Sequence, residues 1–406
     1  MSDVLDEQLM WDPADPGQIA DPYPAYVRLR SEAPLWRHPS AWVLSRYADV
    51  EPALRDRRLL THGLQGENLL ETLMEDLTPP IGERTRTHQR PWLLFQSGQH
   101  HTRMRRALST GFGPKSMAQA RHRVAAVVDD LVDRIRDEPR VEFVESIAVS
   151  IPITVICELF DVPAELRPSL RNLLNPLTRT MLGVPMTDDS IADVDAAVAD
   201  FEDAMRELIA VRRERPGDDM VSLMVHGEEA FVEERDVLSN LGVLLFAGYE
   251  TTVGLLSNGL LALLRHPEQR AALLREPELV PNAVEEMLRY DAPTQRTARV
   301  VHEPVEIRGQ RIERGELVWL LLGSANRDED RWEDVTSFDI RRRSPQPLSF
   351  GKGPHFCIGA PLARLEAHLA FPKVLEALEG YELETDQVAY NPSATLRVPR
   401  ELWLAR

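Results

Sequence analysis

Apolar side chains recur every three to four positions along most of the chain, which is the period of an amphipathic α-helix. Several of these segments end at clear stop signals, such as Arg215-Pro216-Gly217. Pro281 stands near the start of another segment, where its missing amide proton costs nothing. Eight helices are predicted on this basis, at residues 25–32, 104–109, 117–136, 191–213, 236–264, 267–275, 280–290 and 362–378.

Strand-like segments are fewer, and they cluster in pairs. They cover residues 36–45, 300–307 and 311–322, and the last two are separated by a turn at residues 308–310. The regular alternation of strand and helix that a doubly wound parallel sheet requires is absent. The pattern therefore predicts a mainly α fold with small antiparallel β-sheets, formed by residues 1–406 as a single domain. Residues 60–97 have turn residues and weak periodicity, and they are predicted to form a long irregular surface loop.

The longest apolar run covers residues 241–264 and contains Glu250 as its only charged residue. It nearly reaches the roughly 20 residues that a membrane-spanning helix needs. However, it lies in the middle of the chain, contains four glycines and carries polar residues such as Thr251 and Asn258. We therefore interpret it as the central buried helix of a large helical domain, and we expect no membrane span.

The composition excludes several classes of function. Lys and Arg number 47 against 65 Asp and Glu, a net charge of −18, which disfavours binding to nucleic acid or to an anionic membrane. The first residues lack the basic and apolar regions of a secretory signal, so a cytoplasmic location is expected. The two cysteines, Cys157 and Cys357, are 200 positions apart, which argues against a disulfide framework and a cysteine-rich zinc site.

Cys357 lies in the most informative segment of the chain. Gly351, Gly353 and Gly359 flank it, and a long amphipathic helix follows. Free amide protons and the positive end of the helix dipole favour a thiolate at such a position, which suggests a metal ligand or a nucleophile. The glycines allow the backbone to fold tightly under the sulfur and a flat cofactor to approach. Taken alone, the cysteine is equally compatible with a buried small apolar residue.

A second segment, from Ala247 to Thr252, lies in the middle of the central helix. Gly248 narrows the helix surface, so that a small ligand could lie against the backbone, and Thr251 can donate a hydrogen bond to the carbonyl of Ala247 one turn earlier. The simpler interpretation is a packing glycine beside a solvated polar residue.

The segment Phe350-Gly-Lys-Gly-Pro-His-Phe-Cys-Ile-Gly359 resembles the haem-binding loop of the cytochrome P-450 family at every defining position. The resemblance implies the cytochrome P-450 fold, in which a long central helix crosses one face of haem b and the cysteine loop lies on the other. It also implies that the Cys357 thiolate is the proximal iron ligand, that Phe350 packs near the sulfur and that His355 bonds a haem propionate.

The segment Ala247-Gly248-Tyr-Glu250-Thr251 is similar to the family's oxygen-activating motif, residue by residue. The resemblance implies O2 as a cosubstrate and Glu250 and Thr251 as a proton relay, because reduction of dioxygen needs two protons. The expected activity is that of a monooxygenase that inserts one oxygen atom into a hydrophobic small molecule, by hydroxylation or epoxidation, in natural-product or secondary metabolism. An alternative within the family is a non-insertion oxidation, such as desaturation, aryl coupling or dealkylation.

Glu286 and Arg289 resemble the structural E-x-x-R pair of the same family. Many relatives complete this network with an arginine before a Phe-Asp pair, but Ser337 occupies that position here. The third partner is therefore open, and Arg341 and Trp332 are the two candidates.

His101 and Arg105 are four residues apart on one face of a short predicted helix. Hydrogen-bonding or cationic groups at this spacing suit a pair of carboxylates. In the family such a pair clamps the haem propionates together with an arginine of a later strand, for which we choose Arg299 over Arg296.

The resemblance also implies redox partners. The chain leaves no room for an attached flavin or iron–sulfur domain, so electrons are expected from a separate ferredoxin and its reductase, with NAD(P)H acting only indirectly. An acidic ferredoxin is expected to dock on the proximal face of a monomeric enzyme. The basic residues that suggest this face are Arg103, Arg106, Lys115, Arg121, Arg123, Lys352 and Arg364.

Five segments are expected to border a hydrophobic substrate pocket: residues 60–97, 166–200, the helix face around Leu244 and Ala247, 292–297 and 393–396. The substrate itself is not specified. Two other functions stay open: an enzyme in which Cys357 is a nucleophile assisted by His355, and a haem-binding sensor or carrier without turnover.

Overall fold

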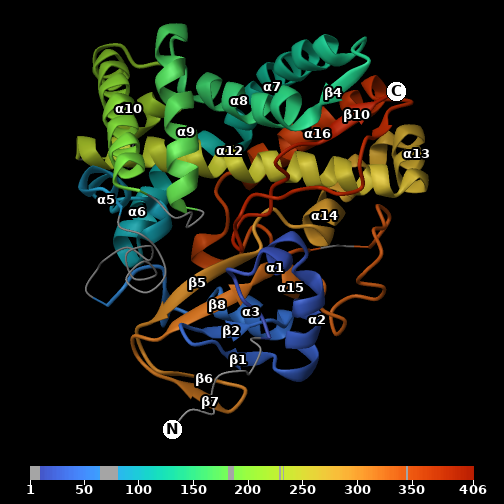
Figure 1. Cartoon of the computed structure of the whole chain (residues 1–406). Coiled ribbons are helices and arrows are strands. Elements are labelled where there is room, and N and C mark those ends of the chain that lie inside the picture. Colours follow the sequence, from blue (N-terminus) through green and yellow to red (C-terminus); the bar gives the residue numbers. More distant parts are fainter. Residues whose placement is uncertain (1–9, 65–80, 182–186, 228–229, 232, 344–345) are drawn as a thin grey trace.

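The computed structural model describes residues 10–64, 81–181, 187–227, 230–231, 233–343 and 346–406. Helix α12 (Glu234–Arg265) runs through the middle of the molecule, and other helices pack around it (Figure 1). Most of its side chains are buried, including Asn240, Glu250 and Asn258. No helix in the described part of the chain has both the length and the hydropathy that a membrane span requires.

The helices that contact α12 directly come from both halves of the chain. They are α5 (Glu83–Gln89), α8 (Ser150–Phe160), α9 (Arg167–Met181), α10 (Asp188–Glu214), α11 (Met220–His226), α13 (Pro267–Arg275), α14 (Val280–Tyr290) and α16 (Ala360–Ala377). Helix α7 (Pro114–Ile135) packs against α8 and α16. The remaining helices are α1 (Pro16–Ala20), α2 (Tyr23–Glu32), α3 (Tyr47–Ala53), α6 (Gly98–Ser109) and α15 (Leu322–Ala325).

The largest sheet lies below α12 in Figure 1, beside α1, α2, α3 and α15, and has the strand order β1-β2-β8-β5-β3. Its strands are β1 (Leu35–Arg37), β2 (Trp42–Leu44), β3 (Leu59–Leu60), β5 (Arg296–Val301) and β8 (Leu317–Leu321). A second sheet joins β4 (Arg140–Glu142), β10 (Trp403–Ala405) and β9 (Glu382–Leu383). Strands β6 (Val305–Ile307) and β7 (Gln310–Ile312) form a hairpin, in which both turn residues, Arg308 and Gly309, have positive φ.

The mainly α fold with small sheets is confirmed, and all eight predicted helices are present within a few residues of the expected ends, except that α6 begins six residues earlier. Three details differ from the sequence-based expectations. Strand β2 pairs with β8 in parallel, whereas the other described pairings are antiparallel. The predicted strand at 300–307 is two strands, β5 and β6, which belong to different sheets. The expected irregular loop at 60–97 contains α5 in its described part, while residues 65–80 lie outside the described residues.

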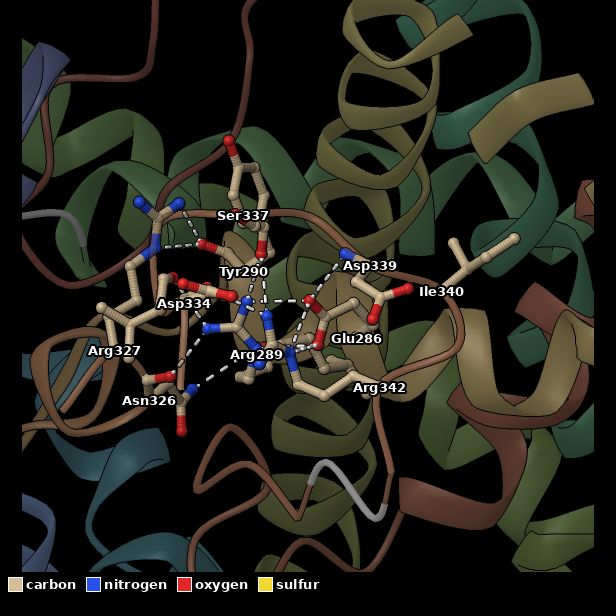
Figure 2. Close-up of polar contacts among 12 residues, drawn as sticks. Glu286, Arg289, Tyr290, Asn326, Arg327, Asp334, Ser337, Asp339, Ile340 and Arg342 are labelled. Carbon is tan, nitrogen blue, oxygen red and sulfur yellow. Dashed lines mark hydrogen bonds and ion pairs between the residues drawn. The ribbon is translucent and has the colours of Figure 1, made fainter. Parts of the chain in front are cut away.

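Glu286 of α14 is completely buried, and it anchors the irregular chain that leads towards Cys357 (Figure 2). Its carboxylate accepts hydrogen bonds of 2.7 and 2.8 Å from Arg289 and of 3.1 Å from Arg342. It also accepts a 3.1 Å hydrogen bond from the backbone amide of Asp339. Because a buried carboxylate is stable only when it is paired and hydrogen-bonded, this arrangement holds residues 333–342 against α14.

The two arginines also donate hydrogen bonds to the same stretch of backbone. Arg289 donates to the carbonyl oxygens of Val335 and Ser337, and Arg342 donates to those of Glu333, Asp334 and Ser337. The carbonyl oxygen of Ser337 therefore accepts from both guanidinium groups, although its side chain is not the missing third partner.

The third partner of the Glu286–Arg289 pair is Arg342, so both sequence-based candidates were wrong. Arg341 points elsewhere and pairs with Glu276 at 2.5 Å on the surface. Trp332 contacts Tyr47 and Arg331 instead. Turns of the irregular segment decide which of the two neighbouring arginines faces Glu286. Such turns have no periodicity from which the direction of each side chain could be inferred.

We expect Arg342→Ala to lower the free energy of unfolding by about 2–3 kcal/mol, because it removes a charged hydrogen-bond partner of a buried carboxylate. Arg341→Ala is the matched control: it removes the adjacent arginine, whose ion pair with Glu276 is exposed to solvent, and should leave the stability nearly unchanged. Urea unfolding followed by circular dichroism measures both. Equal losses in the two variants would contradict the assignment.

Candidate functional site

A cavity of about 470 Å³ lies between α12 and the loop that carries Cys357. Ala247, Thr251 and Leu255 of α12 line it from one side, and Cys357 and Gly359 line it from the other. The central helix and the cysteine loop, about 100 residues apart in sequence, thus face the same space. Most of the remaining lining side chains are apolar, among them Leu93, Phe95 and Leu396.

Two glycines shape the loop before Cys357, because they have backbone conformations that other residues rarely adopt. Gly351 and Gly353 have φ of 68° and 69°, in the left-handed region. A side chain on Gly353 would also place its Cβ 2.9 Å from the carbonyl oxygen of Leu54. The loop closes through a 2.8 Å hydrogen bond from the Cys357 amide to the carbonyl oxygen of Phe350, and α16 begins three residues after Cys357.

The surroundings of the Cys357 thiol act on its pKa in opposite directions. Burial raises the pKa, whereas the amides of Gly359 and Ala360 and the charges of Arg105 and Arg364 lower it. The helix-start amides thus act as expected, but burial outweighs them in the protein alone. The other cysteine, Cys157, is buried in α8, where burial raises its pKa to about 11, as suits an unreactive core residue.

On the opposite side of the cavity, the Thr251 hydroxyl donates a 2.7 Å hydrogen bond to the carbonyl oxygen of Ala247. This bond was predicted from the sequence and is confirmed. Gly248 also lines the cavity, but a Cβ there would lie 3.0 Å from Ile156 of α8. The glycine therefore allows α8 to approach α12, in addition to leaving space beside the helix backbone.

Glu250 lies next to Thr251 in sequence but not in the wall of the cavity. Its side chain is buried, and its Oε1 accepts a 3.1 Å hydrogen bond from Asn391 Nδ2. Burial raises the pKa of Glu250 to about 7, and the hydrogen bond from Asn391 acts against this shift. A carboxyl group with such a pKa can both release and accept a proton near neutral pH. Asn391 had no role in the sequence analysis, because it follows Glu250 by 141 residues.

Four of the predicted cofactor-binding residues, His101, Arg105, Arg299 and His355, line one region of the cavity. The rings of His101 and His355 are 4.3 Å apart, and burial together with nearby positive charges lowers their pKa values to about 4 and about 2. Arg299 is buried, and among the described residues its side chain donates to Thr297 Oγ1 and the carbonyl oxygen of Ala298.

Among the described residues this group has no carboxylate partner, and the buried His101 Nε2 has no hydrogen-bond partner. The region is therefore suited to a bound anion. His355 faces His101 and Thr61, and within the described part of the chain no hydrogen bond joins it to Cys357. This arrangement disfavours the pairing of a cysteine nucleophile with a histidine base.

Four of the five predicted pocket segments contribute to the cavity wall through residues that include Thr61, Leu244, Thr294 and Thr395. No described residue of 166–200 lines it. The sequence analysis missed α8, whose Ile156, Leu159 and Phe160 line the cavity. Helix α8 is apolar on most of its surface, so it lacks the polar face that makes a helix recognisable by its periodicity.

Glu366 of α16 is a further lining residue that the sequence analysis did not identify. Its carboxyl group is buried, its Oε2 has no hydrogen-bond partner, and burial raises its pKa to about 8. It is therefore held as the neutral acid at pH 7. The burial of Glu366 follows from the packing of α16 against α12 and α14. In the sequence, Glu366 looks like an ordinary polar residue of a helix.

Comparison with known proteins identifies the family. The family model described as "Cytochrome P450" matches residues 188–399. The chain is 35% identical over 370 residues to "Cytochrome P450 107B1" of Saccharopolyspora erythraea, which covers 88% of this chain and 87% of that protein. It is 32% identical to "Polyketide biosynthesis cytochrome P450 PksS" of Bacillus subtilis, over 96% of this chain and 97% of that protein.

Solved structures agree with this assignment. The crystal structure of CalO2 superposes with a TM-score of 0.89 at 30% identity, over 97% of this chain and 98% of that one. The chain therefore belongs to the cytochrome P450 family and is a P450 monooxygenase, an enzyme class that uses haem and O2.

The residues around the cavity fit a haem group. Cys357 and residues of α12 line the same cavity, and the side chains of His101, Arg105, Arg299 and His355 in its wall suit the two propionates that haem carries. Gly359 also lines the cavity, and a Cβ at this position would lie 4.0 Å from the Cys357 sulfur.

The raised pKa of Glu366 predicts a specific dependence of stability on pH. Between its ordinary value of 4.5 and about 8, the folded protein holds a proton that the unfolded chain has released, so this group lowers stability as pH rises. As the pH is raised from 5 to 8, the free energy of unfolding of Glu366→Gln should therefore increase relative to that of the wild type by at least about 1 kcal/mol. Chemical denaturation at both pH values measures this difference.

Glu376→Gln on the same helix is the matched control, because Glu376 is exposed. It should follow the wild type at both pH values. If Glu366→Gln also followed the wild type at both pH values, Glu366 would not be protonated in the folded protein.

Proposed function

We propose that the protein is a haem-thiolate monooxygenase, in which Cys357 is the axial ligand and His101, Arg105, Arg299 and His355 bind the haem propionates. The observation that carries this proposal is that Cys357 and Thr251 line one cavity, together with arginines that have no carboxylate partner among the described residues and a His101 Nε2 without a hydrogen-bond partner. Phe350 supports the cysteine loop: it packs 4.4 Å beneath the Arg364 guanidinium, which Glu285 holds in place. Haem supplies the electron-accepting and dioxygen-activating chemistry.

The residues of α12 would deliver protons to the cavity. The Thr251 hydroxyl is at the cavity wall and has its own proton directed to Ala247, so its oxygen can accept a hydrogen bond from a ligand. Glu250 lies behind this wall with a pKa near 7 and would resupply Thr251. Since no hydrogen bond joins the two side chains in the described structure, the transfer requires a bridging water or a rotation of Glu250 away from Asn391.

The substrate would be an apolar small molecule that is bound between Leu244 and Leu396 and oxidised by insertion of one oxygen atom. Leucine, isoleucine and phenylalanine side chains form most of the wall on this side. A role in natural-product metabolism is supported by the name of the Bacillus subtilis relative, which refers to polyketide biosynthesis. A non-insertion oxidation at the same site is the second candidate, because the same wall would hold its substrate.

We expect Thr251→Ala to keep the wild-type absorption spectrum but to release several times more hydrogen peroxide per NADH consumed, because the cavity then lacks a hydroxyl to direct protons. The measurement uses a surrogate ferredoxin and reductase with the same saturating ligand for every variant. Thr251→Ser is the control, since it keeps the hydroxyl and should stay within about twofold of wild type. An unchanged peroxide yield in Thr251→Ala would refute the proton relay.

A separate acidic ferredoxin would supply the electrons. Exposed basic side chains occur on α6 and at the start of α7, and α7 packs along α16, the helix that follows Cys357. Of the residues proposed for this surface, Arg364 already pairs with Glu285 and Arg123 donates to the carbonyl oxygen of Glu158. We therefore assign the main role to Arg103, Lys115 and Arg121.

The docking proposal predicts a strong dependence on ionic strength. The rate of reduction by an acidic ferredoxin should fall several-fold between low salt and 0.5 M salt, because screening weakens attraction between exposed charges. Lys115→Glu with Arg121→Glu should cause a similar loss at low salt, whereas Arg314→Glu on the β7–β8 turn should not. A rate that does not respond to salt would overturn the electrostatic docking.

A further inference from the structure

Arg296, at the start of β5, is a third arginine in the wall of the cavity, besides Arg105 and Arg299. It precedes Arg299 by three residues, and three threonines line the wall close to it in the fold. Thr294 and Thr297 flank it in sequence, and Thr395 comes from the end of the chain, where Leu396 forms a bridge with Thr294. Apolar residues form most of the remaining cavity wall.

The guanidinium of Arg296 is held in a fixed position by two indole rings and a hydrogen bond. It lies 4.6 Å from the centre of the Trp319 ring and 5.4 Å from that of Trp11. Its Nε donates a 3.1 Å hydrogen bond to Thr395 Oγ1. A guanidinium that is already ordered in this way loses little conformational entropy when a ligand binds it.

This positive charge has no anionic partner in the described part of the chain. The hydrogen bond to Thr395 is the only one that the Arg296 side chain makes there, this side chain forms no ion pair, and its buried Nη1 has no acceptor. Burial lowers the pKa of Arg296 to about 10, so the side chain is still charged at neutral pH. An uncompensated charge in such surroundings is unfavourable, and an added anion would relieve this cost.

Other arginines buried in the fold are paired with carboxylates. Arg30 pairs with Glu329 at 2.7 Å, Arg289 with Glu286 at 2.7 Å and Arg397 with Asp291 at 2.8 Å. Three arginines of the cavity wall lack a carboxylate among the described residues: Arg299, which is buried, and Arg105 and Arg296, which are half-buried. The protein therefore leaves three positive charges beside a space that ligands can occupy.

Arg296 and Arg299 belong to different surroundings. Arg299 is among the charges that lower the pKa of His355, together with His101 and Arg105, and thus belongs to the proposed propionate site. Arg296 is not among them, and the charged or titratable group that acts on it is Tyr26 of α2. Propionates bound by Arg299 and its histidine neighbours would therefore leave Arg296 without a partner.

We propose that Arg296 binds a carboxylate group of the substrate, so that the enzyme acts on apolar molecules that carry one carboxylate. This inference rests on the proposed function and names the substrate class of that site. The planar guanidinium can donate to both carboxylate oxygens, and Thr294 or Thr395 can add a third hydrogen bond. The apolar remainder of the substrate lies against Leu396 and Leu244, which directs it towards the wall that contains Thr251.

Binding of matched acids and amides to the haem-loaded protein tests the assignment. The probes are straight-chain carboxylic acids from hexanoic to tetradecanoic acid and the corresponding primary amides, which have nearly the same shape but no charge. Dissociation constants come from calorimetry and from the change in the haem absorption spectrum. For wild type, we expect the best-binding acid to bind at least tenfold more tightly than its amide.

In Arg296→Gln this preference should fall below twofold, while in Arg296→Lys part of it should remain, because the lysine keeps the charge but loses the planar fork. Circular dichroism and haem content check that each variant is folded. If Arg296→Gln does not fold, the comparison between wild type and Arg296→Lys decides, since a loss of at least threefold in the preference is still expected.

An acid preference that is absent in wild type, or that survives unchanged in both variants, would overturn the assignment. These outcomes are distinguishable from a failure of the proposed function. If the acids and amides bind equally while Thr251→Ala still diverts electrons to hydrogen peroxide, the monooxygenase stands and only the role of Arg296 is wrong.

Discussion

The carboxylate of Glu286 is buried away from water, and the path of the chain near the cysteine loop depends on how it is paired. Arg289 and Arg342 neutralise it, and both also bind the backbone of residues 333–337. A buried carboxylate that lost these partners would destabilise the fold, by about 3–5 kcal/mol in comparable cases. The pairing therefore fixes an irregular segment that no helix or strand holds, and this segment leads into the loop of Cys357.

The second feature that determines function is the excess of positive charge around the cavity. Arg105, Arg299 and Arg296 line this space without carboxylate partners among the described residues, and the neutral ring of His101 adds a nitrogen without a hydrogen-bond partner. Each unpaired donor costs free energy, so their presence is better explained by anions that bind there than by stability. In our account the haem propionates occupy one part of this region and a substrate carboxylate occupies another.

Two glutamates near the cavity likewise lack partners of opposite charge among the described residues. Glu250 and Glu366 are both buried without an arginine or lysine partner in the described part of the chain, and burial raises their pKa values to about 7 and about 8. A carboxyl group can store a proton near neutral pH only if no cation stabilises its charged form. Glu250 is behind the wall of α12, where Asn391 holds it, and this position suits a residue that resupplies protons rather than one that contacts the substrate.

Local sequence predicted the parts of the fold that local interactions determine. The Cys357 loop is encoded by its own glycines, and α12 by its apolar residues, so both were identified correctly from the sequence. Helix α8 was missed because it has no polar face, and the parallel pairing of β2 with β8 joins strands that are far apart in the chain. Partners such as Arg342 and Asn391 depend on how distant segments pack, which no periodicity records.

The central claim is that Cys357 binds the haem iron through its thiolate. The absorption spectrum of the reduced, carbon monoxide-bound protein tests it directly, because thiolate ligation shifts the Soret band strongly to the red. We predict this shifted band for the wild type and for Cys157→Ala, and its loss in Cys357→His with haem still bound. A wild-type protein that binds haem without the shifted band, or a Cys357→His variant that keeps it, would contradict the account.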